Sequence, residues 1–309
     1  RCDAAGIGGF VEGRKDDKGR PTNRMIRKFV AVLPTAMFGS GVPVFAPLSR
    51  DLAFADMMSV AGHLLDAEIY DSRTHYILLY VEGIRNARRF MSALRSAARI
   101  KPIILLKAGR HEAGSAAAST HSGMAAVSDT VFDAAVRRAG VVRVQNVGQL
   151  FYAAKALASK FRPRGNRLAI ITNGGGPGVL AADWISEIGL RLGTLGSDKV
   201  AELAPQLLPT ASLVDLIDLS EDATPEHYGL AIQAASKDTG IDGLLVLHSP
   251  KAGTHPGAVA EEVARQKALT GKPLIACWMG DASMAQARAT LTQALIPSFR
   301  TPEAAVDAF

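Results

Sequence analysis

The chain has 309 residues, 48% hydrophobic and 21% charged, a composition typical of a soluble globular protein with room for two domains. Its two cysteines, Cys2 and Cys277, are far apart and lack metal-site spacing, which argues against a disulfide framework and fits a reducing, cytoplasmic compartment. The net charge of +6 is uneven and points away from a uniformly basic, nucleic-acid-binding body.

Residues 1–50 form a basic segment, for which we expect irregular structure. They hold nine Lys and Arg against four Asp and Glu, so most of the net charge lies there. The stretch "GRKDDKGRPTNRMIRK" has no interleaved aromatic residues and is more typical of a solvated connection than of a nucleic-acid site. We read no secretory signal at the start, and prolines and glycines interrupt the uncharged residues 30–49. We therefore expect no membrane span.

From residue 51 onward, short apolar runs alternate with amphipathic ones. This alternation predicts parallel sheets covered by helices on both faces. The expected strands are residues 75–83, 101–109 and 141–144, and the expected helices are 86–100, 128–140 (with Ser128 as the N-cap) and 147–161. Residues 162–166, "RPRGN", are basic, contain Pro and Gly and carry no apolar side chain, as in a domain joint.

The stretch from Lys107 to Ser128 reads as a long loop made mostly of Ala, Gly and Ser, with His121 in its middle. A loop of this length is unusual in a compact α/β domain and is often functional. An imidazole on such a loop suits a nucleophile that carries a group from one place to another. The alternative is an ordinary surface histidine.

Glu82 follows a strand in "LLYVEGI", where a buried carboxylate is unexpected. Such a group could orient an imidazole and stabilise its charged form. The alternative is an acidic residue placed comfortably at the start of a helix.

A glycine-rich turn lies in "ITNGGGPGVLAADW", residues 171–184. The apolar run before it reads as a buried strand, and the run after it reads as a helix that ends at Gly189. Backbone N–H groups at a helix start attract anions, and glycines let an anion approach closely. The alternative is a tight turn that binds nothing. Neither a dinucleotide nor a P-loop fingerprint is present.

The second half repeats the order of the first. In each half a strand is followed by a helix, then Lys-Pro, then another strand, which predicts two flavodoxin-like domains at residues 51–162 and 163–309. Ligands bind such sheets beyond the carboxyl ends of the strands. Glu82, the loop around His121, Gly174 and His248 all lie at such ends.

An acidic cluster follows in "LVDLIDLSEDATPEHY". It contains Asp215, Asp218, Glu221 and Asp222. Metal binding is one reading. The favoured reading is a loop before a helix with Thr224 as N-cap and Pro225 in its first turn, so we assign no metal ligand.

Five segments together resemble the NDP-forming (ADP-forming) acyl-CoA synthetases, relatives of succinyl-CoA synthetase. They are "LLYVEGI", "KPIILLKAGR", "STHSGMAAVSDTVFDAAVRRAGVVRV", "ITNGGGPGVLAADW" and "DATPEHY", and the likeness runs from about residue 51 to 309. The same region also occurs in bacterial lysine acetyltransferases that fuse it to an acetyltransferase domain. The resemblance implies two flavodoxin-like, succinyl-CoA synthetase-type domains.

The resemblance also implies a reaction, the reversible conversion of a carboxylic acid, CoA and ATP to acyl-CoA, ADP and phosphate. His121 matches the family's phosphorylated histidine, and Glu82 matches the glutamate that pairs with it. The phosphate-binding helix start matches Asn173, Gly174, Gly175, Gly176 and Gly178. ATP or ADP with Mg²⁺, and CoA, are then substrates, and no cofactor is covalently bound.

The chain also departs from the family. We find no ATP-grasp segment, and residues 1–50 resemble the expected CoA-binding domain and a second anion-binding helix start only poorly. The implied partners are therefore an ATP-grasp domain or subunit and a CoA-binding module, besides a small carboxylic acid and phosphate, with homo-oligomerisation left open. The alternative is a catalytically silent, synthetase-like regulatory or binding module, as in the fused lysine acetyltransferases.

Overall fold

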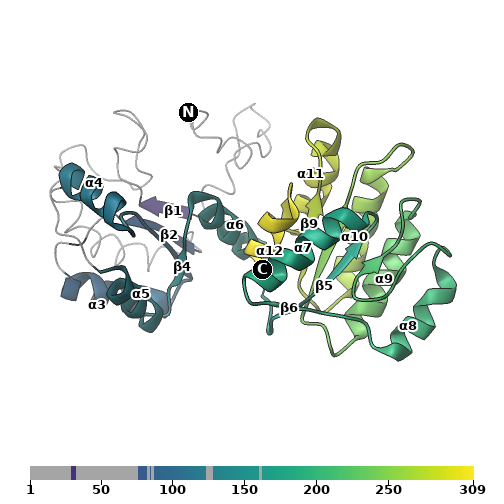
Figure 1. Ribbon diagram of the computed structural model, residues 1–309, viewed down its shortest axis with the longest axis horizontal. Coiled ribbons are helices and arrows are strands. Elements are labelled where there is room, and N and C mark those ends of the chain that lie inside the picture. The colour runs from purple at the N-terminus through teal and green to yellow at the C-terminus, as the bar shows by residue number, and fades with distance from the viewer. Residues whose placement is uncertain (1–28, 33–75, 82–83, 85–86, 123–127, 160–161) are drawn as a thin grey trace, which may run out of the picture. The chain divides into compact units, whose positions relative to one another are not determined.

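The computed structural model describes residues 29–32, 76–81, 84, 87–122, 128–159 and 162–309 (Figure 1). The chain divides into two compact units, Arg1–Ala154 and Lys155–Phe309. The domain boundaries predicted at residues 50 and 162 stay predictions. Each unit contains a parallel sheet, so the predicted α/β class with parallel sheets is confirmed.

The sheet of the first unit has its described strands in chain order, all parallel. They are β1 (Phe29–Val32), β2 (Tyr76–Val81), β3 (Ile103–Lys107) and β4 (Val142–Val144). The described helices are α3 (Ala87–Ala98), α4 (Glu112–Ser122), α5 (Asp129–Arg138) and α6 (Val147–Ala158). Helices α3 and α5 share one core with the sheet, because Leu94 and Val136 are buried with Ile77, Leu79 and Leu105.

The prediction of an irregular segment over residues 1–50 is wrong for Phe29–Val32, which form β1. This strand pairs in parallel with β2, with Phe29 opposite Tyr76. The run "FVAV" is short and precedes a proline-rich stretch, so its strand character depends on pairing with β2, a partner distant in sequence.

The prediction of one long loop between Lys107 and Ser128 is also wrong in part, because Glu112–Ser122 form helix α4. Alanine has the highest helix propensity, and "EAGSAAASTHS" contains a run of it after an acidic first turn. The side chains of residues 112–114, 116 and 117 are exposed, so this helix shows none of the apolar periodicity that would have predicted it.

The second unit has a six-stranded sheet in the order β10-β9-β8-β5-β6, with β7 paired to β5, and every pair is parallel. Its strands are β5 (Arg167–Thr172), β6 (Arg191–Leu192), β7 (Ile217–Asp218), β8 (Gly243–His248), β9 (Leu274–Trp278) and β10 (Ser298–Phe299). Its α-helices are α7 (Gly175–Glu187), α8 (Ser197–Leu203), α9 (Pro225–Lys237), α10 (Pro256–Leu269), α11 (Ala285–Gln293) and α12 (Pro302–Ala308).

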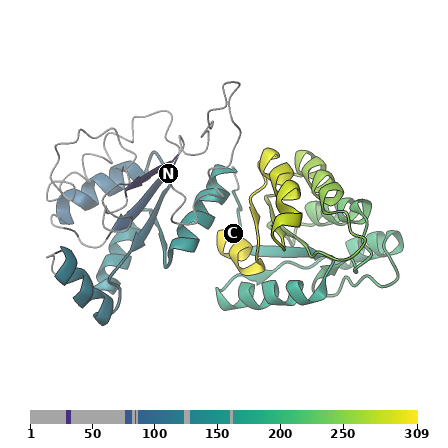
Figure 2. The ribbon, with the colours of Figure 1, turned by 90° about the horizontal axis from the view of Figure 1, so that it is seen from above.

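Helices cover both faces of this sheet (Figures 1 and 2). On one side, α10 packs between α9 and α11, and α7 packs with α12. Strands β5, β8 and β9 are buried over almost their whole length, because side chains on both faces meet helices. The predicted end of α7 is confirmed, since Gly189 follows the helix with a φ of +76°.

The predicted repetition of the two halves is confirmed in the hydrogen bonding of the strands. The order β2-β3-β4 in the first unit corresponds to β8-β9-β10 in the second. In each unit the proline of the Lys-Pro pair accepts from the preceding strand: Pro102 from the amide of Ile77 at 3.0 Å, and Pro273 from the amide of Leu244 at 2.9 Å. Of the helices that the structure describes, none has the length and hydropathy needed to cross a membrane.

Candidate functional site

The strand order of the second unit brings one pair of loops together. The chain leaves β5 for β6 on one side of it and later returns to β8 on the other side. In an open parallel sheet this reversal leaves a crevice at the carboxyl ends of the two strands, where ligands bind. The two loops that meet there follow Thr172 and His248, and the first is the predicted glycine turn.

Asn173 joins these two loops. It is 1% exposed, and its side-chain amide donates to the carbonyl of Ser249 at 3.1 Å. Its Oδ1 accepts from the amide of Ser249 at 2.8 Å. Both hydrogen bonds of the side chain therefore hold the two strand ends at a fixed separation, and they use the polar atoms that a ligand would otherwise meet.

The amides of the turn divide into those already used and those available. The amide of Gly174 donates to Thr172 Oγ1 at 3.0 Å, and that of Gly178 donates to the carbonyl of Gly174 at 3.3 Å. Gly175 and Gly176 are the first two residues of α7, where helix geometry supplies no acceptor, and Pro177 has no N–H. The amides of the turn without an intrahelical acceptor are therefore those of Gly175 and Gly176.

The glycines also differ in the space around them. A Cβ on Gly174 would lie 2.9 Å from Ser249 Oγ, and one on Gly178 would lie 3.0 Å from Leu216 Cδ1. A Cβ on Gly176 would meet nothing within 4 Å. Gly174 and Gly178 therefore serve the packing of the turn, whereas Gly176 faces open space.

Asp218 is a neighbour of the turn that the sequence did not indicate. It lies in β7 opposite Thr172 of β5, and its Oδ2 is 3.1 Å from the place of a Cβ on Gly175. Its Oδ1 accepts from the amide of Ser220 at 3.0 Å. The strand contains only Ile217 and Asp218, which is too short to leave a periodic signal in the sequence. Asp218 places negative charge beside the available amides.

His248 ends β8 at the same edge of the sheet and is 1% exposed. Its ring stacks on Trp278 with centroids 5.4 Å apart, and its Nδ1 lies 3.4 Å from the hydroxyl of Tyr228. Its Nε2 has no hydrogen-bond partner within the described residues. Burial lowers the pKa of His248 to about 4, so the ring is neutral at physiological pH.

The favoured reading of the acidic cluster is confirmed for the helix start, whereas Asp218 lies in strand β7 and not in a loop. Thr224 is the N-cap of α9 and Pro225 is its first residue. Lys251 forms an ion pair with Glu221. No group of three or more His, Cys, Asp or Glu residues in the described ranges could hold a metal ion.

The two catalytic residues expected from the sequence lie elsewhere in the chain. His121 is the penultimate residue of α4, and its side chain is not among those described. Glu82 lies outside the described residues, immediately after β2. The amide of Ala108, directly after β3, donates to the carbonyl of Val81 at 2.9 Å. The described backbone therefore brings the start of the His121 segment beside the strand that precedes Glu82.

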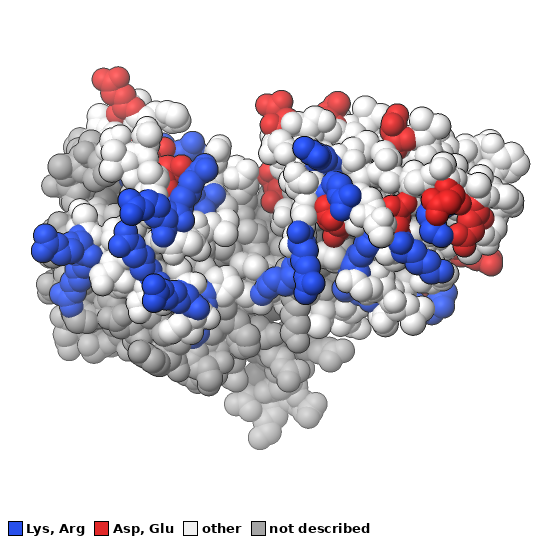
Figure 3. Space-filling model, turned by 90° about the horizontal axis from the view of Figure 1, so that it is seen from below, with Lys and Arg blue, Asp and Glu red and all other residues white. Residues whose placement is uncertain are grey.

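Lys and Arg gather on one face of the first unit (Figure 3). Helix α3 contributes to the basic character of this unit, because Arg88, Arg89 and Arg95 are exposed and the helix contains no acidic residue. The basic character of the protein is therefore not confined to residues 1–50.

Comparison with known proteins agrees with this architecture. Residues 50–157 match the model of the succinyl-CoA ligase-like flavodoxin domain. The chain is 33% identical over 277 residues to the alpha subunit of ADP-forming acetate–CoA ligase II of Pyrococcus furiosus, an alignment that covers 86% of this chain. The chain belongs to the ADP-forming acyl-CoA synthetase family.

Other members of the family give the same result. ADP-forming acetate–CoA ligase I of Archaeoglobus fulgidus is 36% identical over 238 residues, 77% of this chain. The solved acetyl-coenzyme A synthetase 1 of Candidatus Korarchaeum cryptofilum, in complex with phosphate and ADP, is 33% identical over 80% of this chain, with a TM-score of 0.72. The chain spans only part of these relatives: 60% of the P. furiosus subunit, 34% of the A. fulgidus ligase and 54% of the solved chain.

Proposed function

We propose that this chain is part of an ADP-forming acyl-CoA synthetase and that His121 carries a phosphoryl group during the reaction. The reaction converts a carboxylic acid, CoA and ATP reversibly to acyl-CoA, ADP and phosphate. The observation that carries the proposal is the turn between β5 and α7. There the amides of Gly175 and Gly176 are available at a strand-order reversal, in a family with a member solved in complex with phosphate and ADP.

The residues of the turn fit an oxyanion. Two amides without intrahelical acceptors and the positive end of the α7 dipole favour negative charge, and Gly176 leaves the space in front of the helix open. Asn173 contributes by holding the two loops together rather than by a direct contact, because its side-chain amide is engaged with Ser249. The negative charge of Asp218 beside these amides opposes the binding of more highly charged anions.

His121 is proposed to act as the nucleophile. A neutral imidazole nitrogen attacks the phosphorus of an acyl phosphate, the bond from phosphorus to the acyl oxygen breaks, and the carboxylate leaves with the electron pair. The proton on the other ring nitrogen becomes more acidic, and it either stays on that nitrogen or is released to solvent. Glu82 is proposed to orient the ring and stabilise its positive charge.

The rest of the reaction needs further partners. ATP with Mg²⁺ requires a nucleotide site, which we assign to an ATP-grasp domain or subunit, and thioester formation requires a CoA-binding module. The P. furiosus relative is itself an alpha subunit, and this chain covers 60% of it. We propose a small carboxylic acid as the substrate that supplies the acyl group, and the cytoplasm as the compartment in which the protein acts.

The test is phosphoryl transfer to the chain from acetyl phosphate labelled with ³²P. Wild-type protein should take up label that is lost in acid and kept in base, as expected for a phosphohistidine. His121→Ala should take up none, and Glu82→Gln should be labelled more slowly. His111→Ala removes an exposed imidazole from the beginning of the same segment and serves as the control, which should be labelled like the wild type.

Label that persists in the His121→Ala variant would contradict the proposal. Complete absence of label in the wild type would favour the alternative of a catalytically silent regulatory or binding module.

A further inference from the structure

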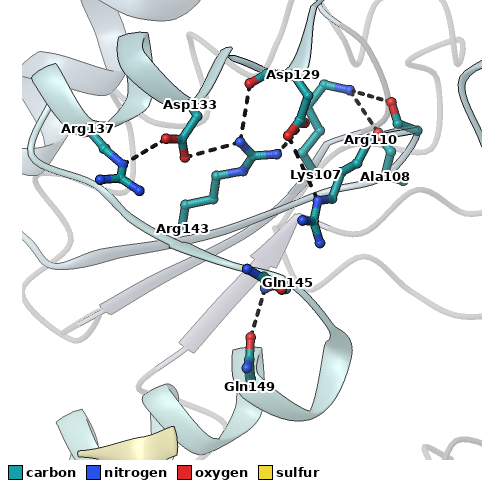
Figure 4. A network of polar contacts seen from close by, with 10 residues as sticks. Lys107, Ala108, Arg110, Asp129, Asp133, Arg137, Arg143, Gln145 and Gln149 are labelled. Atoms are coloured by element: carbon teal, nitrogen blue, oxygen red, sulfur yellow. Dashed lines mark hydrogen bonds and ion pairs between the residues drawn. The ribbon is translucent and has the colours of Figure 1, made fainter. Parts of the chain in front are cut away.

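A network of charged side chains lies where the chain leaves β3 and where it enters α5 (Figure 4). Lys107 is the last residue of β3, and Arg110 follows it. Asp129 is the first residue of α5, and Asp133 lies one turn further along the helix. Arg143 reaches both acids from β4, the neighbour of β3 in the sheet.

Arg143 is the centre of this network. Its side chain is 10% exposed, and it forms ion pairs with Asp129 and, at 3.2 Å, with Asp133. It also donates to the backbone carbonyl of Asp129 at 3.4 Å, and its guanidinium lies 5.3 Å from the ring centroid of Phe132. A largely buried guanidinium with several acceptors holds its partners in one geometry, because its planar fork fixes the direction of each charge-assisted hydrogen bond.

Asp129 also faces Arg110, and these two residues lie at opposite ends of residues 111–128. Its Oδ2 lies 4.0 Å from Nε of Arg110, and that Nε has no hydrogen-bond partner within the described residues. One carboxylate therefore lies between Arg143 of the sheet and Arg110. Because Arg110 and Asp129 flank residues 111–128, both ends of that segment meet at one point.

Lys107 fixes the exit from β3. Its ammonium donates to the carbonyls of Ala108 at 2.9 Å and Gly109 at 3.3 Å, and it lies 5.6 Å from the ring centroid of Phe132. Gly109 has a φ of +67°, a conformation that glycine adopts readily, so the chain turns sharply there. The network thus defines the direction in which the chain enters helix α4.

We propose that Arg143 is a positioning residue for His121. By holding Asp129 against Arg110, it fixes both ends of residues 111–128 to the sheet and so limits the places that His121 can occupy. This role rests on the proposed function of His121. It predicts that loss of Arg143 slows phosphoryl transfer without disturbing the glycine turn, which belongs to the other unit.

The test compares Arg143→Gln with Arg137→Gln. Arg137 pairs with the same Asp133 at 2.8 Å, but its side chain is 77% exposed and it is not bonded to Asp129. Two readouts are measured: hydrogen exchange of the amides of α4 relative to those of β3, and the rate of labelling by ³²P-acetyl phosphate. Exchange in β3 shows whether the first unit is generally damaged, and phosphate affinity by calorimetry shows whether the second unit is intact.

We expect Arg143→Gln to accelerate exchange in α4 and to slow labelling by about tenfold or more, with phosphate affinity unchanged. Arg143→Lys keeps the charge but loses the forked geometry, so it should recover part of the rate. Arg137→Gln should match the wild type in both readouts.

Unchanged exchange in α4 of Arg143→Gln would overturn the positioning role whatever the labelling shows. If the wild type takes up label and Arg143→Gln takes it up at the same rate, the positioning role is overturned, while the proposed function stays intact. A wild type that takes no label would overturn the proposed function, and the positioning role with it.

Discussion

At the scale of single residues, the four glycines of the turn have different physical roles. Gly174 and Gly178 leave room for Ser249 and Leu216, whereas Gly175 and Gly176 carry the available amides. A substitution at Gly174 or Gly178 would disturb packing and binding together. Gly175 is the better test of binding, because a Cβ there meets only the end of the Asp218 side chain at 3.1 Å.

We expect Gly175→Val to weaken phosphate binding by about tenfold or more, because its branched side chain narrows the approach to the amides and pushes against Asp218. Isothermal calorimetry with inorganic phosphate measures the change. Gly257→Val is a matched control, since Gly257 lies in the first turn of α10 and a Cβ there meets nothing within 4 Å. Equal phosphate affinities of wild type and Gly175→Val would count against the site.

His248 shows how burial fixes a protonation state. Trp278 and Tyr228 surround the ring, and burial also raises the pKa of Tyr228 well above its ordinary value. The pKa of His248 is about 4 in the folded protein, against about 6.5 in an unfolded chain. Between these values the unfolded state binds more protons than the folded state. The contribution of His248 to the free energy of unfolding is therefore fully present above pH 6.5 and is lost as the pH falls toward 4.

We therefore expect the second unit to lose about 2 kcal/mol of stability between pH 7.5 and pH 5 through His248 alone. Urea unfolding of the wild type and of His248→Gln at both pH values measures this contribution, which the variant should lack. His255→Gln, at an exposed histidine, should keep the wild-type dependence. Parallel pH profiles for the wild type and His248→Gln would show that the ring does not titrate as its burial implies.

At the scale of elements, the helix starts differ in how their first amides are satisfied. Helix α9 has a capping box, in which Thr224 accepts from the amide of His227 at 3.5 Å and His227 Nδ1 accepts from the amide of Thr224 at 3.1 Å. Helix α5 follows Ser128, the predicted N-cap, but the Ser128 side chain makes no capping bond. Helix α7 follows Gly174, which has no side chain to cap with. Helices α8, α10 and α11 also begin without a side-chain cap, and among these uncapped helix starts α7 is the one at the strand-order reversal.

We expect Thr224→Ala to destabilise the second unit by about 1 kcal/mol, because the first turn of α9 loses an acceptor. Thr224→Ser keeps the hydroxyl and should remain close to the wild type. Chemical unfolding at pH 7.5 distinguishes them. A wild-type midpoint for Thr224→Ala would show that solvent satisfies the amide of His227 as well as the side chain does.

At the scale of the whole molecule, the chain holds two units with related strand order. In each, Lys-Pro precedes a buried strand that pairs with the strand before it, and the residues with the expected chemistry follow the carboxyl ends of strands. The chain spans 52% to 60% of the relatives that are alpha subunits or solved chains, and 34% of the A. fulgidus ligase. A division of the reaction among domains or subunits is therefore part of the proposal.

The sequence by itself determined the strands β2, β3, β5, β8 and β9, because continuous apolar runs between turn residues can be buried only in a covered parallel sheet. It also located the glycine turn, the Thr224 cap and the end of α7 at Gly189, since these depend on local backbone chemistry.

Only the tertiary structure decided the features that depend on partners distant in the sequence. Strand β1 is a strand because it pairs with β2, Asp218 lies beside Gly175 because β7 pairs with β5, and Arg143 joins the two ends of the His121 segment across the sheet. Short strands and ion pairs between distant residues leave no periodic pattern, because the energy that fixes them comes from groups brought together by folding. Helix α4 was not predicted for a related reason. The high helix propensity of alanine favours it, but it has no apolar face, so its sequence of small residues lacks the periodic pattern by which an amphipathic helix is predicted.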